Sequence, residues 1–391
     1  MNAIDRRSFL KGALALPAAV ALPGLFARAA FAAGPGDEVL VLVRLDGGND
    51  GLNTVIPFGD DLYYRARPGL GVPAGQVGRL DDHLGLHPAL AGLRGAWDDG
   101  ALAIVQGVGY PNSSRSHFTS TDIWHTAYTT PPERWSGWVG RALDRTAAGE
   151  VPALQLDPAP LSLALTGERV VVPAVADAES FRVRGRKDLL TALVARPRDG
   201  ETLERIRQAG ASAYVTSSRL EAALGDGAAD GYPDTNLARR LWQIARLIEG
   251  GLPARVYAVR LSGFDTHSRQ ANAHAALLRT LGDALGAFQR DLKATGLDKR
   301  VLAMTYSEFG RRVAENRSLG TDHGAAAPMF VMGGAVKGGL KGAHPSLADL
   351  DEGDLRHHTD FRQVYATILE RWLKVDSKAV LGKAYAPVKF L

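Results

Sequence analysis

Five short apolar runs, each followed by a turn that contains glycine, constrain the fold of this chain more than any other feature. Runs of leucine and β-branched residues with little polar alternation are typical of strands buried on both faces of a parallel sheet. Between these runs, apolar residues recur at three- and four-residue spacing, which predicts amphipathic helices. The predicted strands are 38–45, 101–108, 255–261, 300–306 and 329–332, and the predicted helices are 90–97, 118–128, 203–224, 235–248, 271–293 and 361–373. This alternation predicts a doubly wound α/β fold, with a mostly parallel sheet and helices on both faces.

The middle of the chain departs from this regular alternation. Short strand-like pieces at 161–165 and 170–172 precede a charged helix, and no long apolar run lies between them. We therefore expect residues 34–391 to form a single α/β domain with a less regular insertion at about 151–231.

The first 33 residues have the composition of a targeting segment. Arg6 and Arg7 precede Phe-Leu-Lys, an apolar stretch follows at 12–25, and small residues fill 29–33. This order predicts a signal peptide over 1–33, and the adjacent arginines resemble the twin-arginine (Tat) type. The apolar stretch falls short of the ~20 residues that a span needs, so we expect no stable membrane span here or later in the chain. The Tat machinery is thus an expected partner, and the mature protein is expected in the periplasm or secreted.

Charge and cysteine content exclude several classes of site. The chain has no cysteine, so a disulfide framework, a thiolate-ligated zinc site and a cysteine nucleophile are all excluded, and a bound metal would need oxygen and imidazole ligands. The net charge is +4, and Arg6, Arg7, Lys11 and Arg28 against Asp5 supply +3 of it. The remainder has 42 basic against 41 acidic residues without a basic run, which argues against nucleic-acid binding.

Acidic residues follow three of the predicted strands. Asp46, Asp265 and Glu308 lie in or beside turns that contain glycine, and any one of them alone would be an ordinary turn residue. Ligands of open α/β sheets bind beyond the carboxyl ends of the strands, where these side chains are expected to meet. Clustered carboxylates repel each other unless a cation or proton compensates them, and His267 and His323 lie nearby in the chain. The pattern therefore predicts a divalent metal site of mixed oxygen and nitrogen ligands.

The order of these residues resembles the alkaline phosphatase superfamily of phosphatases and sulfatases. An Asp ends the first strand, a hydroxyl residue begins a later helix, and an Asp/His cluster and a strand-end acid precede Gly-Thr-Asp-His at 320–323. The chain after the signal also resembles one branch of that superfamily, the Tat-exported bacterial proteins of the domain of unknown function 1501 family. Five sequence segments carry this second resemblance: 45–53, 115–118, 264–267, 307–311 and 320–324.

The superfamily resemblance implies an exported, metal-dependent hydrolase of phosphate or sulfate esters that acts on small molecules or glycans. It implies one or two divalent ions, zinc before calcium or magnesium, and a hydroxyl nucleophile at a helix start. Ser116 matches the nucleophile, Ser113 and Ser114 are adjacent alternatives, and a hydroxyl there is also a standard N-cap. Arg115 and His117 beside it complete the expected catalytic group. The expected metal ligands are Asp46, Asp265, His267, Glu308, Asp322 and His323.

Three features depart from the superfamily pattern. Asp265-Thr266-His267 replaces a wider Asp-x-x-x-His spacing, and Glu308 replaces an Asp. Phe309 stands where the superfamily places a metal-binding histidine beside the strand-end acid, and phenylalanine cannot ligate a metal. This departure favours an alternative function, a catalytically silent secreted binding or envelope-assembly protein that keeps the fold. A third alternative is a metal-assisted hydrolase of another bond that forms no covalent intermediate.

Overall fold

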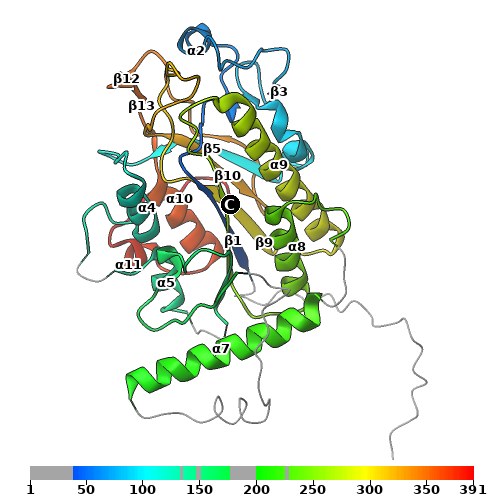
Figure 1. Ribbon diagram of the computed structural model, residues 1–391. Helices are drawn as coiled ribbons and strands as arrows, with labels where there is room; N and C mark the ends of the chain where they lie inside the picture. The colour runs from blue at the N-terminus through cyan, green and yellow to red at the C-terminus, as the bar shows by residue number, and fades with distance from the viewer. Residues whose placement is uncertain (1–37, 133–134, 147–150, 177–199, 225–228) are drawn as a thin grey trace, which may run out of the picture. The chain divides into compact units, whose positions relative to one another are not determined.

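The computed structural model describes residues 38–132, 135–146, 151–176, 200–224 and 229–391 (Figure 1). These residues all fall within one compact unit, Pro35–Leu391. The signal peptide predicted over 1–33 lies outside the described residues, as does part of the segment 151–231. None of the helices in the described part of the chain is both long and apolar enough to cross a membrane.

The central sheet has nine strands within the described residues, in the order β11-β5-β10-β9-β1-β8-β6-β7, and β14 pairs with β5. β10 pairs antiparallel with β5 and β9, and the other pairs are parallel. The prediction of a mostly parallel α/β sheet is therefore confirmed. The strands are β1 (Val39–Asp46), β5 (Leu102–Gly109), β6 (Ala153–Leu156), β7 (Ala174–Val175), β8 (Val256–Ser262), β9 (Val301–Tyr306), β10 (Ala327–Met332), β11 (Gly339–Lys341) and β14 (Thr359–Asp360).

Two smaller sheets lie outside the central one. One contains β2 (Val55–Ile56), β4 (Gly85–Leu86) and β3 (Gly78–Arg79), and the other pairs β12 (Leu350–Asp351) with β13 (Asp354–Leu355). The helices are α2 (Asp61–Ala66), α3 (Arg94–Asp98), α4 (His117–Thr126), α5 (Trp138–Leu143), α7 (Glu201–Leu224), α8 (Asn236–Glu249), α9 (Gln270–Ala294), α10 (Phe361–Thr367) and α11 (Ser377–Leu381).

Helices cover both faces of the central sheet, because the side chains of β1 are apolar on both of its faces. Val41 and Val43 pack in one core with α8 and α9, whereas Leu40 and Leu42 pack in a second core with α4, α5 and α10. Figure 1 shows these two groups of helices on opposite sides of β1. Because successive side chains of a strand point to opposite faces, a run that is apolar throughout is buried on both faces.

The segment 151–231 contributes strands to the sheet instead of lying apart from it. β6 pairs with β8, and β7 pairs with β6. The two pieces predicted as strand-like differ: 161–165 contains a 3-10 turn, Leu163–Leu165, and 170–172 is not a strand. The start of the piece 170–172 is not free to pair with a strand, because the Asp144 carboxylate accepts hydrogen bonds from the backbone N–H groups of residues 168–170.

The sheet topology brings the functional loops to one edge. β1 lies between β8 and β9, parallel to both, so the three strands end at the same edge. Asp46 ends β1, Asp265 follows β8 and Glu308 follows β9. β5 also runs parallel to β9, since both pair antiparallel with β10, and the loop after β5 leads into α4 at this edge.

Candidate metal centre

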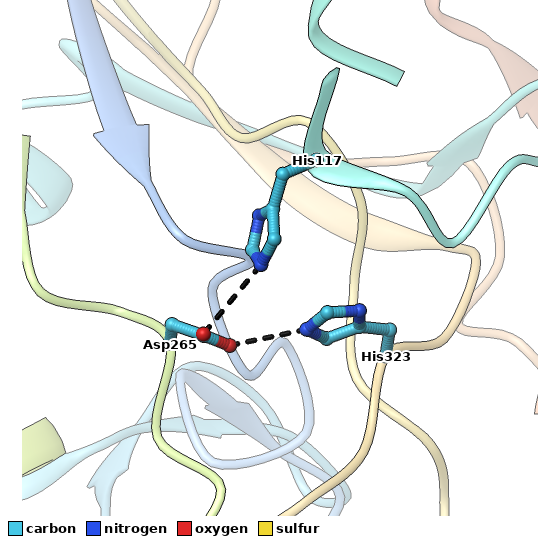
Figure 2. Close-up of side chains that lie close together, drawn as sticks. All are labelled: His117, Asp265 and His323. Carbon is cyan, nitrogen blue, oxygen red and sulfur yellow. Dashed lines mark hydrogen bonds and ion pairs between the residues drawn. The ribbon is translucent and has the colours of Figure 1, made fainter. Parts of the chain in front are cut away.

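Three histidines and one aspartate converge at this edge of the sheet. Asp265 Oδ1 lies 3.0 Å from His267 Nε2 and 3.1 Å from His323 Nε2, and Asp265 Oδ2 lies 3.5 Å from His117 Nε2. The Nε2 atoms of His267 and His323 are 2.9 Å apart. Figure 2 shows His117 and His323 directing ring nitrogens at the two carboxylate oxygens of Asp265. We call these four side chains the His/Asp cluster.

Each member of the His/Asp cluster comes from a chain segment that follows a strand of the central sheet. His117 is the first residue of α4, whose N-cap is Ser116. Asp265 and His267 lie in the loop between β8 and α9, and His323 lies between β9 and β10, where it forms a backbone bridge with Arg311. The convergence therefore follows from parallel strands that share one carboxyl edge.

The opposite ring nitrogen, Nδ1, of every histidine in the cluster contacts a hydrogen-bond acceptor. His117 Nδ1 lies 2.9 Å from Glu308 Oε1, and His323 Nδ1 lies 2.8 Å from the carbonyl oxygen of Arg115. His267 Nδ1 lies 3.4 Å from Asp322 Oδ1. A backbone carbonyl can only accept, so His323 Nδ1 carries the proton, and the carboxylates impose the same tautomer on the other two rings. In neutral rings, Nε2 then presents a lone pair to the cluster.

This donor set fits a divalent cation. The Nε2 lone pair of each histidine faces the Asp265 carboxylate, and close acceptors repel unless protons or a cation lie between them. One ligand atom from each of His117, Asp265 and His323 lies within 4.8 Å of the other two. Histidines that ligate metals usually donate their other N–H to a carboxylate or carbonyl, which is the arrangement of these three rings. Imidazole-rich sites suit zinc and similar transition metals, whereas calcium and magnesium prefer oxygen ligands.

Arg311 holds the carboxylate of the cluster in place. Its guanidinium is fully buried, and Nη2 donates to Asp265 Oδ1 at 2.7 Å. Nε donates to the carbonyl of Gly48 at 2.7 Å and Nη1 to that of Thr321 at 2.8 Å, so one side chain ties together three loops. Partial burial raises the pKa of Asp265, but the hydrogen bond and the positive charge of Arg311 outweigh that effect and lower the pKa to about 2. Asp265 is therefore an anion at neutral pH.

Phe309 forms the inner wall of the cluster. Its side chain is 1% exposed, and its ring centroid lies 4.9 Å from that of His117 and 4.5 Å from that of His323. Gly48 closes the other side with φ +82°, and a Cβ on it would lie 2.2 Å from the Phe309 ring. Phe309, which departs from the superfamily pattern, thus orients two imidazoles by packing against them.

Three expected metal ligands lie behind or beside the cluster. Glu308 is 1% exposed, and its Oε1 accepts from Gly47 N as well as contacting His117 Nδ1. Asp322 lies behind His267 and accepts a hydrogen bond from Asn316 Nδ2 at 3.1 Å. Asp46 lies between two arginines, 2.5 Å from Arg44 Nη2 and 3.1 Å from Arg260 Nη1.

Of the expected catalytic group around Ser116, one residue belongs to the His/Asp cluster and the others make contacts elsewhere. His117 belongs to the cluster, while the side chain of Arg115 is paired with Asp354 at 2.5 Å. Ser116 Oγ accepts from Thr119 N at 3.5 Å as an N-cap, and the residue is exposed. Ser114 Oγ accepts from Ser116 N at 3.2 Å. Ser113 Oγ is buried and has no hydrogen-bond partner among the described residues.

A pocket of about 500 Å³ opens on one side of the His/Asp cluster. His117 and Asp265 form part of its wall, so a ligand in the pocket can reach the cluster. The other lining residues are Arg44, Asp46, Gly47, Phe118, Thr121, Asp122 and Gly263.

Several solved structures resemble this chain at low sequence identity. A protein in the alkaline phosphatase superfamily from Vibrio parahaemolyticus has a TM-score of 0.39 and 10% identity, over 88% of this chain and 69% of that one. The lipoteichoic acid synthase LtaP from Listeria monocytogenes has a TM-score of 0.31 and 11% identity, over 76% and 65%. Ps i-CgsB has a TM-score of 0.37 and 8% identity, over 89% and 73%. None of the curated proteins matches the chain.

Two family models match the sequence itself. The model of the twin-arginine translocation signal sequence matches residues 3–23, which confirms the expected Tat signal and implies export to the periplasm or beyond. A second model, described as protein of unknown function (DUF1501), matches residues 37–384. Because this match spans most of the sequence, the chain belongs to the DUF1501 family.

Proposed function

We propose that the His/Asp cluster binds one divalent transition-metal cation, zinc in the first instance, and that the exported protein hydrolyses phosphate or sulfate esters. The observation that carries the proposal is the convergence of three Nε2 atoms and one carboxylate whose outer contacts fix the tautomer of every ring. His117, His267, His323 and Asp265 would hold the cation. A cation there would withdraw charge from a substrate oxygen and stabilise the negative charge that develops as the ester bond breaks.

The remaining residues of the proposed site have defined tasks. Glu308 and Asp322 orient two of the histidines, and Arg311 keeps Asp265 ionised and in position. Arg44 and Arg260 hold Asp46 at the edge of the pocket, so we do not include Asp46 among the ligands.

Ser116 is the proposed nucleophile of this reaction. It directly precedes the ligand His117, it is exposed, and the contact that its Oγ receives from Thr119 N is long at 3.5 Å. A hydroxyl that is held so weakly can turn toward a substrate without unfolding the helix start.

A metal-binding protein without catalysis is the second candidate function. The described residues contain one group of histidine and acidic side chains within ligand distance of each other, whereas the superfamily resemblance implies one or two ions. Asp46 is paired with two arginines, which favours a single cation.

The test uses protein loaded with zinc and three chromogenic substrates: 4-nitrophenyl phosphate, bis(4-nitrophenyl) phosphate and 4-nitrophenyl sulfate. We expect turnover of at least one of them, loss of that turnover in His323→Ala, and a large loss in Ser116→Ala. An unchanged rate in Ser116→Ala would remove this serine from the nucleophile role. Protein that holds the metal but cleaves none of the three would favour the binding function.

A further inference from the structure

One face of α4 lines the pocket beside the His/Asp cluster, and the proposed reaction so far assigns no role to its residues. Phe118, Thr121 and Asp122 line the pocket together with His117 and Asp265 of the His/Asp cluster. Residues three and four apart are neighbours on a helix surface, which places Phe118 beside both Thr121 and Asp122. Asp122 lies five residues beyond His117, or about 7.5 Å along the helix axis at 1.5 Å per residue.

Among the acidic side chains that line this pocket, the Asp122 carboxyl has no hydrogen-bond or ion-pair partner within the described residues. Its neighbour Thr121 accepts a hydrogen bond from Arg44 Nη2 at 3.0 Å. The charged and titratable groups around the same pocket are Arg44, Asp46, His117 and Asp265, and each has a partner of its own. Partial burial raises the pKa of Asp122 above its usual value, which favours the protonated carboxyl.

Phe118 gives the same face an apolar surface. Its side chain is 86% exposed, the largest exposure among the large apolar residues of the described chain that lie at the surface. An exposed aromatic ring beside a polar site is suited to contact with a flat or ring-shaped group of a ligand. The ring of Phe118 and the carboxyl of Asp122 therefore offer an apolar contact and a proton donor on one helix face.

We propose that this face of α4 is the leaving-group site, where Asp122 protonates the leaving oxygen of an ester whose alcohol carries a ring and Phe118 contacts that ring. This inference rests on the proposed hydrolase function. Ser116 Oγ bonds to phosphorus or sulfur and releases its proton to solvent while the bond to the leaving oxygen breaks. The electron pair of the broken bond stays on the leaving oxygen, which takes the proton of the Asp122 carboxyl. One water then cleaves the Ser116 ester: its oxygen ends on phosphorus or sulfur, Ser116 regains a proton, and the proton released earlier restores the Asp122 carboxyl.

The test compares two esters of the class that the protein cleaves, one with 4-nitrophenol and one with unsubstituted phenol as the leaving group. Phenol is the poorer leaving group and depends more on protonation, and general acids contribute about 100-fold or more. In Asp122→Asn we expect about a 100-fold loss of kcat on the phenyl ester and a much smaller loss on the 4-nitrophenyl ester. Phe118→Ala is expected to raise KM for the phenyl ester several-fold and to leave KM for a methyl ester unchanged.

Asp234→Asn is the matched control, because the side chain of Asp234 is 99% exposed and outside the pocket. It is expected to behave as the unmodified protein on both esters. An equal loss on the two esters in Asp122→Asn, with zinc content unchanged, would overturn the role of Asp122 and leave the hydrolase function intact. Unmodified protein that holds zinc and cleaves neither ester would overturn both proposals.

Discussion

Replacing Glu308 by glutamine tests whether the carboxylate behind His117 strengthens metal binding. Glu308 Oε1 accepts from Gly47 N and contacts His117 Nδ1, each at 2.9 Å, and the side chain is 1% exposed. Glutamine has nearly the same shape but no charge. A hydrogen bond to a charged group contributes about 1.5–3 kcal/mol to stability, and one between neutral groups about 0.5–1.5 kcal/mol. The exchange should therefore weaken the interaction between residue 308 and His117 by about 1 kcal/mol or more.

Metal affinity reports this loss directly. Mutation of an outer hydrogen-bond partner of a metal-ligating histidine typically lowers metal affinity about 10- to 100-fold, which corresponds to about 1.4–2.8 kcal/mol. We therefore expect the Kd of the protein for zinc to rise at least about tenfold in Glu308→Gln. Competition with a chromophoric chelator of known zinc affinity at pH 7.5 measures this change.

The matched control is Glu221→Gln on the exposed side of α7, which should leave the Kd unchanged. Thermal unfolding of both variants shows whether the exchange has disturbed the fold. A Glu308→Gln variant that is folded and binds zinc as tightly as the unmodified protein would refute the reasoning that His117 is a ligand oriented by Glu308.

Three further predictions concern residues around the site. Asp46→Asn should keep full zinc content, because Asp46 pairs with Arg44 and Arg260 instead of the cation, and a loss of metal by elemental analysis would make it a ligand. Phe309→Ala should lower the free energy of unfolding of the metal-free protein by about 3–5 kcal/mol in urea titrations, the usual cost of truncating a buried phenylalanine, and a loss below about 1 kcal/mol would contradict its packing role. Burial lowers the pKa of His125 to about 3 from an unfolded value near 6.5, so its contribution to stability is complete above pH 6.5 and is lost as the pH falls toward 3. Between pH 6.5 and 4.5 this loss is about 2 kcal/mol, and urea titrations of metal-free His125→Gln at both values should show a correspondingly smaller drop than the unmodified protein.

The position of the site could be predicted from the sequence because it depends on backbone topology. The five apolar runs predicted the strands β1, β5, β8, β9 and β10 within one or two residues, whereas the short strands β6, β7, β11 and β14 have no such run. Parallel strands end at one edge whatever their side chains are. Asp265, His267 and His323 directly follow or lie between such strands, so their approach to each other follows from the strand order.

Which side chain faces the cluster depends on local partners that the pattern of strands does not reveal. Arg44 lies two residues before Asp46, on the same face of β1. Arg260 is the register partner of Arg44 on β8. That spacing was a signal in the sequence that Asp46 would be paired with arginine. The resemblance puts His117 in the catalytic group beside Ser116, but its place as a ring of the cluster depends on where α4 begins and on the contact of Nδ1 with Glu308.

The central claim is that His117, His267, His323 and Asp265 together hold one cation, and the zinc content of the folded, exported protein tests it most directly. After saturation with zinc and removal of free metal, elemental analysis should find about one zinc per chain in the unmodified protein and much less in His323→Ala and Asp265→Ala. Less than about half an equivalent in the unmodified protein, or full content in both variants, would contradict the claim.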